Sequence, residues 1–291
     1  MKNFKIIRAL AILIVVLSLA SSLAGLLSTG GNGQYAFRAI NGSTVQIQGT
    51  GLYRNDSVSV AAQGIASDLI TLAVGIPLLA SSLYFAGKGS FRSRLLLTGT
   101  LGFFLYTYMS YTFLWMYNPF FIVYVLLMSC SLFAFILSMM SFDIETIKSM
   151  FKNDMPVRLL GGFQIFIAIA VGLLWLGKIA PSIVAGTVPA GLDHYTTLVI
   201  QAMDLGIVVP AALMSGILLV RKRPYGYLLS SVIIIKGITM LTAISAMIIN
   251  QALCGVAMSP METALFPALN IFAFICLAIL MKSVVGTHKP A

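Results

Sequence analysis

The sequence predicts an all-α polytopic membrane protein with about eight transmembrane helices. Of its 291 residues, 59% are hydrophobic and only 9% are charged, a composition outside the range of soluble globular domains. The apolar residues are gathered in runs of about 20, and a helix of that length crosses the ~30 Å hydrocarbon core of a bilayer. The formal charge of +10 therefore belongs to the loops of a membrane protein and does not indicate a nucleic-acid partner.

The first predicted helix occupies residues 1–28 and begins with the basic residues Lys2, Lys5 and Arg8. A basic start before an apolar run is also typical of a cleaved signal peptide, and small residues near the end of the run would permit cleavage. Because the apolar character continues to Leu27, we expect the segment to remain as a transmembrane helix.

The longest polar interval, residues 30–65, follows this helix. It begins with the glycine-rich stretch 30–33 and continues with two alternating stretches, Val45-Gln46-Ile47-Gln48 and Val58-Ser59-Val60. Alternation with a period of two between glycines predicts a small β-hairpin outside the membrane. The loop either covers an outward-facing pocket or serves as an ordered connector.

The second and third helices are predicted at residues 66–86 and 95–117. The outer half of the third helix contains Tyr106, Tyr108 and Tyr111, which lie deeper than an interfacial aromatic belt requires. Their hydroxyl groups need hydrogen-bond partners in hydrocarbon. These tyrosines either bond to neighbouring helices or line a pocket.

The fourth helix is predicted at residues 120–142. The loop at 143–158 carries charges of both signs and is expected to lie along the inner membrane surface. The fifth helix is predicted at 159–176 and the eighth at 266–285. Glu262 lies just before the eighth helix and is a candidate polar group for an outward-facing site.

The sixth and seventh apolar runs, Thr196–Val220 and Tyr225–Ile249, each contain one charged residue, Asp204 and Lys236. A charge at this depth costs a few kcal/mol, so it normally faces a partner or a water-filled cavity. The basic turn at 221–224 is short enough to make the two helices antiparallel neighbours. Both charges then lie away from this turn, about one helical turn apart in height. The pair is either a structural ion pair or a site for a substrate, an ion or a proton.

The second and sixth helices contain similar segments. The stretch Ala66-Ser67-Asp68-Leu69 matches Ala202-Met203-Asp204-Leu205, and both helices continue to a proline, Pro77 and Pro210. In this alignment Asp68 corresponds to Asp204, which makes Asp68 a further candidate for the site. Chance similarity between apolar segments is the alternative.

This similarity predicts two four-helix halves in parallel orientation, related by an axis along the membrane normal. The first half would comprise residues 1–142, including the outer loop, and the second half residues 159–291. Residues 143–158 would form the cytoplasmic loop between them. A site shared by the halves is then expected between the second, third, sixth and seventh helices.

The distribution of basic residues predicts the orientation. Only Arg38, Arg54 and Lys178 fall on or near the side of the long polar loop, Lys236 lies in the membrane, and every other lysine and arginine lies on the opposite side. Basic loops remain in the cytoplasm. We therefore expect a multi-pass protein of the cell membrane (plasma or inner membrane) with cytoplasmic N- and C-termini.

The pattern favours a transporter-like protein for a small solute, coupled to protons or ions. Proline-broken helices in paired halves and charges within the membrane are typical of such carriers. A non-catalytic ligand-binding or accessory subunit of a larger complex is the alternative, and an intramembrane enzyme is third. The candidate ligand or ion-pair residues are Asp204, Lys236, Asp68, Tyr106, Tyr108, Tyr111 and Glu262.

No catalytic residue, metal site or cofactor is predicted, because no metal-ligand spacing, phosphate loop or nucleophile motif occurs and the three cysteines are scattered. The expected partners are the lipid bilayer, a small-molecule solute, and either another membrane protein or a second copy of the chain. No nucleic-acid partner is expected.

Overall fold

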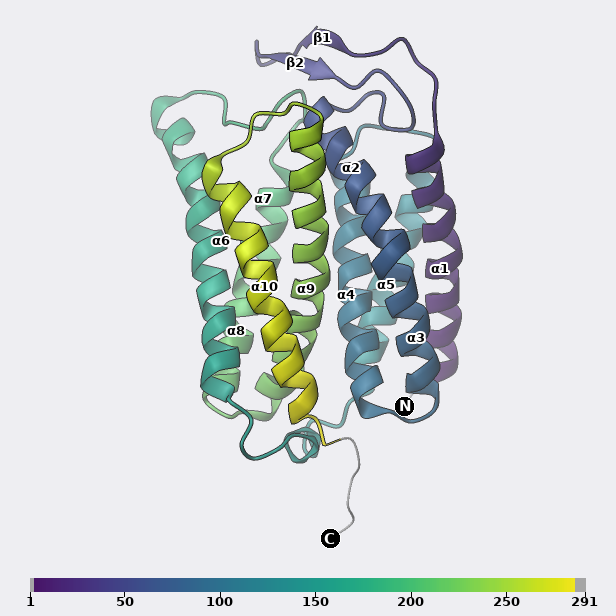
Figure 1. Cartoon of the computed structure of the whole chain (residues 1–291), viewed down its shortest axis with the longest axis vertical. Helices are drawn as coiled ribbons and strands as arrows, with labels where there is room; N and C mark the ends of the chain where they lie inside the picture. The colour runs from purple at the N-terminus through teal and green to yellow at the C-terminus, as the bar shows by residue number, and fades with distance from the viewer. Residues whose placement is uncertain (1–2, 286–291) are drawn as a thin grey trace.

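The computed structural model describes residues 3–285 and confirms an all-α, multi-pass membrane protein. The helices run side by side in an elongated bundle, and a two-stranded sheet covers one end (Figure 1). We call this end the hairpin end. The opposite end carries the turn at 221–224, and we call it the basic end.

The first half of the chain forms helices α1 to α5. Helices α2 and α3 are joined by a five-residue π-helical turn, η1 (Thr71–Gly75), so that residues 58–87 form one continuous segment. The bounds are α1 (Phe4–Leu27), α2 (Val58–Ile70), α3 (Ile76–Gly87), α4 (Phe91–Phe113) and α5 (Phe121–Met139).

The second half of the chain forms helices α6 to α10, with a short 3-10 helix, η2 (Ile147–Met150), in the loop that precedes it. A second π-helical turn, η3 (Asp204–Val208), interrupts the segment that contains Asp204. The bounds are α6 (Val157–Ala185), α7 (Val199–Met203), α8 (Val209–Val220), α9 (Pro224–Leu253) and α10 (Pro260–Ser283).

Within the described residues, seven helical segments are long and apolar enough to cross a membrane: α1, α2–α3, α5, α6, α7–α8, α9 and α10. The 23-residue helix α4 is not among them because threonine, serine and tyrosine side chains lower its hydropathy. Helix α4 packs against α3, α5 and α9 in the middle of the bundle, where polar side chains find partners in protein. Eight transmembrane helices therefore remain a prediction.

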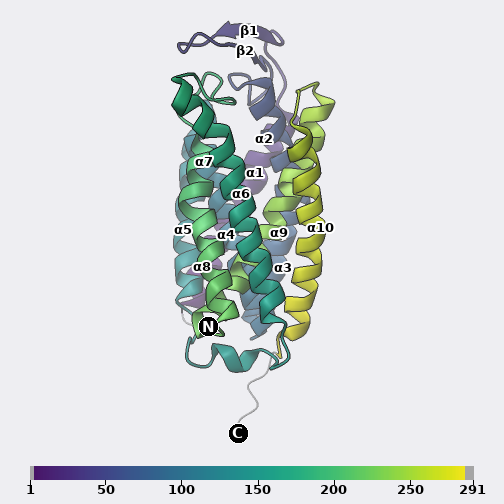
Figure 2. The ribbon, with the colours of Figure 1, turned by 90° about the vertical axis from the view of Figure 1, so that its left-hand side faces the viewer.

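The two halves meet along α9, which packs against α2 and α4 of the first half. In the first half, α1 packs along α5. Helices α6 and α10 of the second half make few close backbone contacts with each other, and Figure 2 shows them diverging toward the hairpin end. The second half is therefore more open than the first.

The small hairpin is confirmed, although one of the two stretches that predicted it is helical. Strands β1 (Tyr35–Arg38) and β2 (Thr44–Ile47) pair antiparallel. The stretch 58–60 forms the first turn of α2 instead, because the Ser57 side chain accepts a hydrogen bond from the Val60 backbone N–H and caps the helix. Three alternating residues are too few to outweigh a helix cap.

Two helices extend further toward the hairpin end than predicted. Helix α6 continues to Ala185 through Pro181, and α10 begins at Pro260, so that Glu262 lies in its first turn. The prediction ended the fifth helix at about residue 176, just before Lys178. In the structure, Lys178 forms an ion pair with Glu262, which satisfies both charges.

Candidate functional site

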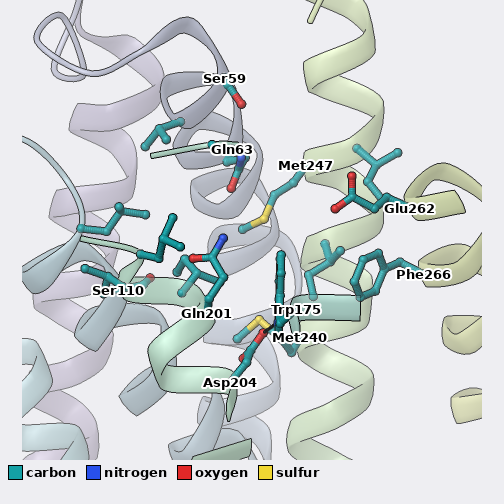
Figure 3. A pocket seen from close by; sticks show the side chains of 18 of the residues that line it. Ser59, Gln63, Ser110, Trp175, Gln201, Asp204, Met240, Met247, Glu262 and Phe266 are labelled. Carbon is teal, nitrogen blue, oxygen red and sulfur yellow. Dashed lines mark hydrogen bonds between the residues drawn. The ribbon is translucent and has the colours of Figure 1, made fainter. Parts of the chain in front are cut away.

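A cavity of about 520 Å³ lies between the two halves of the bundle and reaches the hairpin end. Its walls come from α2, α4, α6, α7, α9 and α10 and from the loops that precede α7 and α10 (Figure 3). A cavity of this size accommodates a small organic molecule. Most of the wall is apolar, with side chains that include Val171, Met240, Ile244, Met247 and Phe266.

Asp204 lies at the deep end of the cavity, as the first residue of η3. The Tyr106 hydroxyl donates a hydrogen bond of 2.7 Å to Asp204 Oδ1. The Trp175 Nε1–H donates a hydrogen bond of 2.8 Å to Asp204 Oδ2. Each carboxylate oxygen therefore accepts a bond from an uncharged donor in the wall.

Lys236 contacts the ring of the same tyrosine, Tyr106. Its Nζ is 4.1 Å from the centroid of the Tyr106 ring, a cation–π contact. Among residues 3–285, Lys236 makes no ion pair with a carboxylate and no side-chain hydrogen bond. The two charges predicted to be neighbours thus share the cavity floor and one tyrosine, without the direct ion pair that the spacing allowed.

The π-helical turn beside Asp204 has a cause in the sequence. Both η1 and η3 end immediately before an apolar residue and a proline, Ile76-Pro77 and Val209-Pro210. Proline has no N–H to donate to the preceding turn, and its ring crowds that turn's carbonyl. Single π-turns of this kind are frequent at functional sites.

Asp68 lies apart from this cavity. It is 3% exposed and accepts hydrogen bonds from the hydroxyl groups of Tyr53, at 2.5 Å, and Tyr111, at 3.1 Å. Gly25 of α1 makes room for it, because a Cβ at that position would lie 1.9 Å from Asp68 Oδ2. Asp68 therefore belongs to a closed polar cluster within the first half.

The three tyrosines predicted as candidates are also divided between the cavity and the closed cluster of the first half. Tyr111 also donates a 3.0 Å hydrogen bond to the Gly64 carbonyl, and the Tyr108 hydroxyl lies 3.4 Å from Ser21 Oγ. Both are buried among aromatic rings of the first half. Only Tyr106 lines the cavity.

Glu262 lies nearer the mouth of the cavity. Its ion pair with Lys178 connects α10 to α6 at the hairpin end, and both residues line the cavity. The Lys178 Nζ also lies 5.4 Å from the centroid of the Trp175 ring.

Trp175 and Gln201 belong to the site although the sequence pattern did not single them out. Gln201 lies three residues before Asp204, a spacing that places both on one helix face. Its place in the site could therefore have been predicted from the sequence. Trp175 gave no such signal, because its contact with Asp204 joins α6 to η3. Figure 3 shows Trp175 beside Asp204, with Gln201 above them in the cavity.

A second buried acid connects the loops above the cavity. Asp56 Oδ1 accepts hydrogen bonds from the Met116 backbone N–H, at 2.9 Å, and from the Tyr195 hydroxyl, at 3.0 Å. Burial raises the pKa of Asp56 to about 7, although both hydrogen bonds oppose the shift. The contact joins the start of α2 to the end of α4 and to the loop before α7.

Within residues 3–285, no group of three or more histidine, cysteine, aspartate or glutamate side chains is placed to hold a metal ion. Comparisons with protein-family models, with curated proteins and with solved structures find no match to this chain. The site is therefore interpreted from its own chemistry.

Proposed function

We propose that the protein is a carrier that takes up a small organic solute through a cavity open to the outside of the cell membrane. The basic residues gather at the basic end, and basic loops remain in the cytoplasm. The hairpin end then faces outward, with both termini inside. The observation that carries the proposal is a cavity that runs from the hairpin end to Asp204 and Lys236 within the bundle.

The half of the bundle below the cavity supplies the barrier that a carrier needs. Leu95, Val232 and Ile235 are at most 3% exposed there. Gly99 lets α4 and α9 approach closely, because a Cβ at Gly99 would lie 2.4 Å from the Cβ of Ile235. A solute at Lys236 therefore meets a closed apolar layer on the cytoplasmic side.

The π-turns supply positions at which this barrier can open. Each interrupts the α-helical hydrogen bonds of a segment that lines the junction of the halves, and such interruptions are where membrane helices bend. In this proposal, the second half rocks against the first about α9. Asp204 serves as the proton or cation acceptor and Lys236 as its counter-charge.

Side-specific thiol labelling tests the proposal. Cys254 is exposed near the hairpin end, whereas Cys130 and Cys276 are buried. A Cys254→Ser protein with Gln201→Cys is placed in sealed vesicles and treated with a membrane-impermeant thiol reagent from either side. A carrier should react at residue 201 from the outside and, more slowly, from the cytoplasmic side. Leu101→Cys, fully buried in α4, should react from neither side.

The same experiment decides between the carrier and a membrane-embedded binding or accessory subunit. The tight packing below Lys236, together with the bridge from Phe151 to Val284 that pins the 143–158 loop against the end of α10, favours the second candidate. Reaction at residue 201 from the outside alone supports that candidate and contradicts transport. Absence of reaction from both sides contradicts an outward-open cavity.

A further inference from the structure

We infer that the cavity binds a monocarboxylate with an apolar body, and that the carboxylate pairs with Lys236. The inference rests on the proposed function, since it requires the cavity to be accessible, and it specifies the chemical class of the solute.

We infer that the charged end of the ligand is an anion, because hydrogen-bond donors on the cavity floor lack acceptors. Each oxygen of Asp204 already accepts a hydrogen bond, from Tyr106 and from Trp175. Lys236 carries three N–H donors, and none of them meets an acceptor among residues 3–285. A ligand that brings acceptors satisfies a group that the protein leaves unsatisfied, whereas a cationic ligand would place a second cation beside Lys236.

The Asp204 charge does not exclude an anion from the floor. Hydrogen bonds from Tyr106 and Trp175 disperse that charge, and both donors are fixed by the walls. Lys236 lines the cavity, and its Nζ contacts the Tyr106 ring without an ion pair to Asp204. The Lys236 ammonium group is therefore positioned by the Tyr106 ring, and its N–H donors are left for a ligand.

Gln201 supplies a second polar contact. Its amide lines the cavity and makes no hydrogen bond with the described side chains or backbone, and Figure 3 shows it directed into the cavity above Asp204. An amide N–H there is suited to the second oxygen of a carboxylate. One ammonium group and one amide match a single carboxylate.

The apolar body follows from the rest of the wall. Away from the polar floor and the ion pair of Lys178 with Glu262, α6 contributes Ile167 and Val171 to the lining, and α10 contributes Phe266 and Leu269. Met240, Ile244 and Met247 of α9 line the space between them. Flexible methionines and branched side chains suit an alkyl or aryl chain of variable shape.

The few backbone contacts between α6 and α10 indicate where the apolar body of the ligand lies. In the first half, α1 and α5 pack closely at the corresponding place. In the second half, the ring of Phe163 contacts that of Phe272 toward the basic end, with ring centroids 4.9 Å apart, and the Lys178–Glu262 ion pair joins the two helices nearer the hairpin end. The apolar body of the ligand extends into the space between these two contacts, toward the lipid.

Equilibrium binding of radiolabelled decanoate to the full-length protein in lipid nanodiscs tests the inference, with binding to empty nanodiscs subtracted. We expect one saturable site at which decanol and decylamine compete at least about tenfold more weakly than unlabelled decanoate, since a charged hydrogen bond is lost. This head-group series needs no variant.

Variants of Lys236 locate the carboxylate. Lys236→Met should weaken decanoate binding about tenfold or more, and Lys236→Arg should retain most of it. The matched control Lys222→Met, in the basic turn, should bind as the unchanged protein does. Equal decanoate affinity in Lys236→Met, or stronger competition by decylamine, would overturn the inference, as would the absence of a saturable site.

The labelling of Gln201→Cys separates this failure from failure of the proposed function. If residue 201 reacts with the thiol reagent but decanoate does not bind at a saturable site, the carboxylate inference is wrong and the carrier proposal is unaffected. If residue 201 does not react, both the carboxylate inference and the carrier proposal are wrong.

Discussion

At the scale of single residues, Tyr106 is the side chain that organises the cavity floor. Its hydroxyl donates to Asp204, and its ring lies under the Lys236 Nζ. One residue of α4 therefore fixes a carboxylate from the sixth predicted helix and an amine from the seventh. The tolerance of these two charges within the bundle depends on this shared neighbour.

The two variants Tyr106→Phe and Tyr108→Phe test this role as a matched pair. Loss of the Tyr106 hydroxyl removes a hydrogen bond to a carboxylate, which contributes about 1.5–3 kcal/mol to the free energy of unfolding. The Tyr108 hydroxyl has only a 3.4 Å contact with Ser21, so its loss should cost clearly less. Denaturant unfolding in mixed micelles measures both, and equal losses would contradict the assignment.

Asp56 is a titratable residue outside the membrane-spanning segments whose environment predicts a pH dependence. Burial raises its folded-state pKa to about 7 from 3.8, so the folded loops bind a proton that the unfolded chain releases near pH 4. The contribution of Asp56 to stability is fully present below the unfolded pKa. It decreases as the pH rises toward 7, by up to about 1.4 kcal/mol per pH unit.

The folded arrangement of the loops around Asp56 should therefore become less stable as the pH rises from 4 to 7, because ionisation places a charge in a buried site. In Asp56→Asn, the amide oxygen still accepts hydrogen bonds but does not ionise, so this part of the pH dependence should disappear. Rates of proteolysis in the loop before α7, compared between the two proteins across pH 4 to 8, measure the effect. Parallel pH profiles for the two proteins would show that Asp56 does not titrate in this range.

At the scale of elements, the π-turns explain why Asp68 and Asp204 have different surroundings. The sequence alignment paired these two acids. The π-turns begin at Thr71 and Asp204, and a proline follows each start by the same interval, 77 − 71 = 6 and 210 − 204 = 6. This register pairs Asp204 with Thr71, and Asp68 with Gln201.

An internal repeat in this register remains a proposal. It keeps the alignment of Pro77 with Pro210, and it removes the three-residue gap that the match of the two aspartates required. It also predicts that the polar site of the second half lies one helical turn away from the polar cluster of the first. That displacement is consistent with the separation of Asp68 from the cavity.

Deletion of Gly206 tests the part played by η3. A π-turn accommodates one additional residue in an α-helix, and no atom lies within 4 Å of a Cβ added at Gly206. Removing this residue should restore a regular α-helix, leave the protein folded, and shift Asp204 relative to Tyr106 and Trp175. Decanoate binding should then fall severalfold.

Deletion of Leu213, in the regular helix α8, serves as the control for Gly206. It rotates everything on one side of the deletion by about 100° and should reduce the yield of folded protein severely. Equal loss of folded protein in the two deletions would show that η3 is not an insertion in a regular helix. Size-exclusion profiles and thermal unfolding compare them.

At the scale of the whole molecule, composition predicted the membrane class, the apolar runs predicted the helical segments, and alternation with a period of two predicted the hairpin. The neighbourhood of Asp204, Lys236 and Tyr106 was predictable too, because a charge in lipid requires a partner and a short turn makes its helices neighbours. The Trp175 contact and the closure of Asp68 by Tyr53 were not, since they depend on packing between elements distant in sequence.

The asymmetry between the halves is a second feature that the sequence did not reveal. Helices α1 and α5 close the first half around a satisfied acid, whereas α6 and α10 leave a cavity whose lysine makes no ion pair or side-chain hydrogen bond among the described residues. Apolar helices of similar composition formed both arrangements, so hydropathy alone does not distinguish them. The site arises where the second half fails to close.

The central claim is that Asp204 and Lys236 form the floor of a cavity that a solute enters from the hairpin end. The rate at which a membrane-impermeant thiol reagent modifies Gln201→Cys from outside sealed vesicles, with and without decanoate, measures this directly. The account predicts rapid modification that decanoate slows and that Lys236→Met makes insensitive to decanoate. A cysteine at position 201 as unreactive as one at the buried position 101 would contradict it.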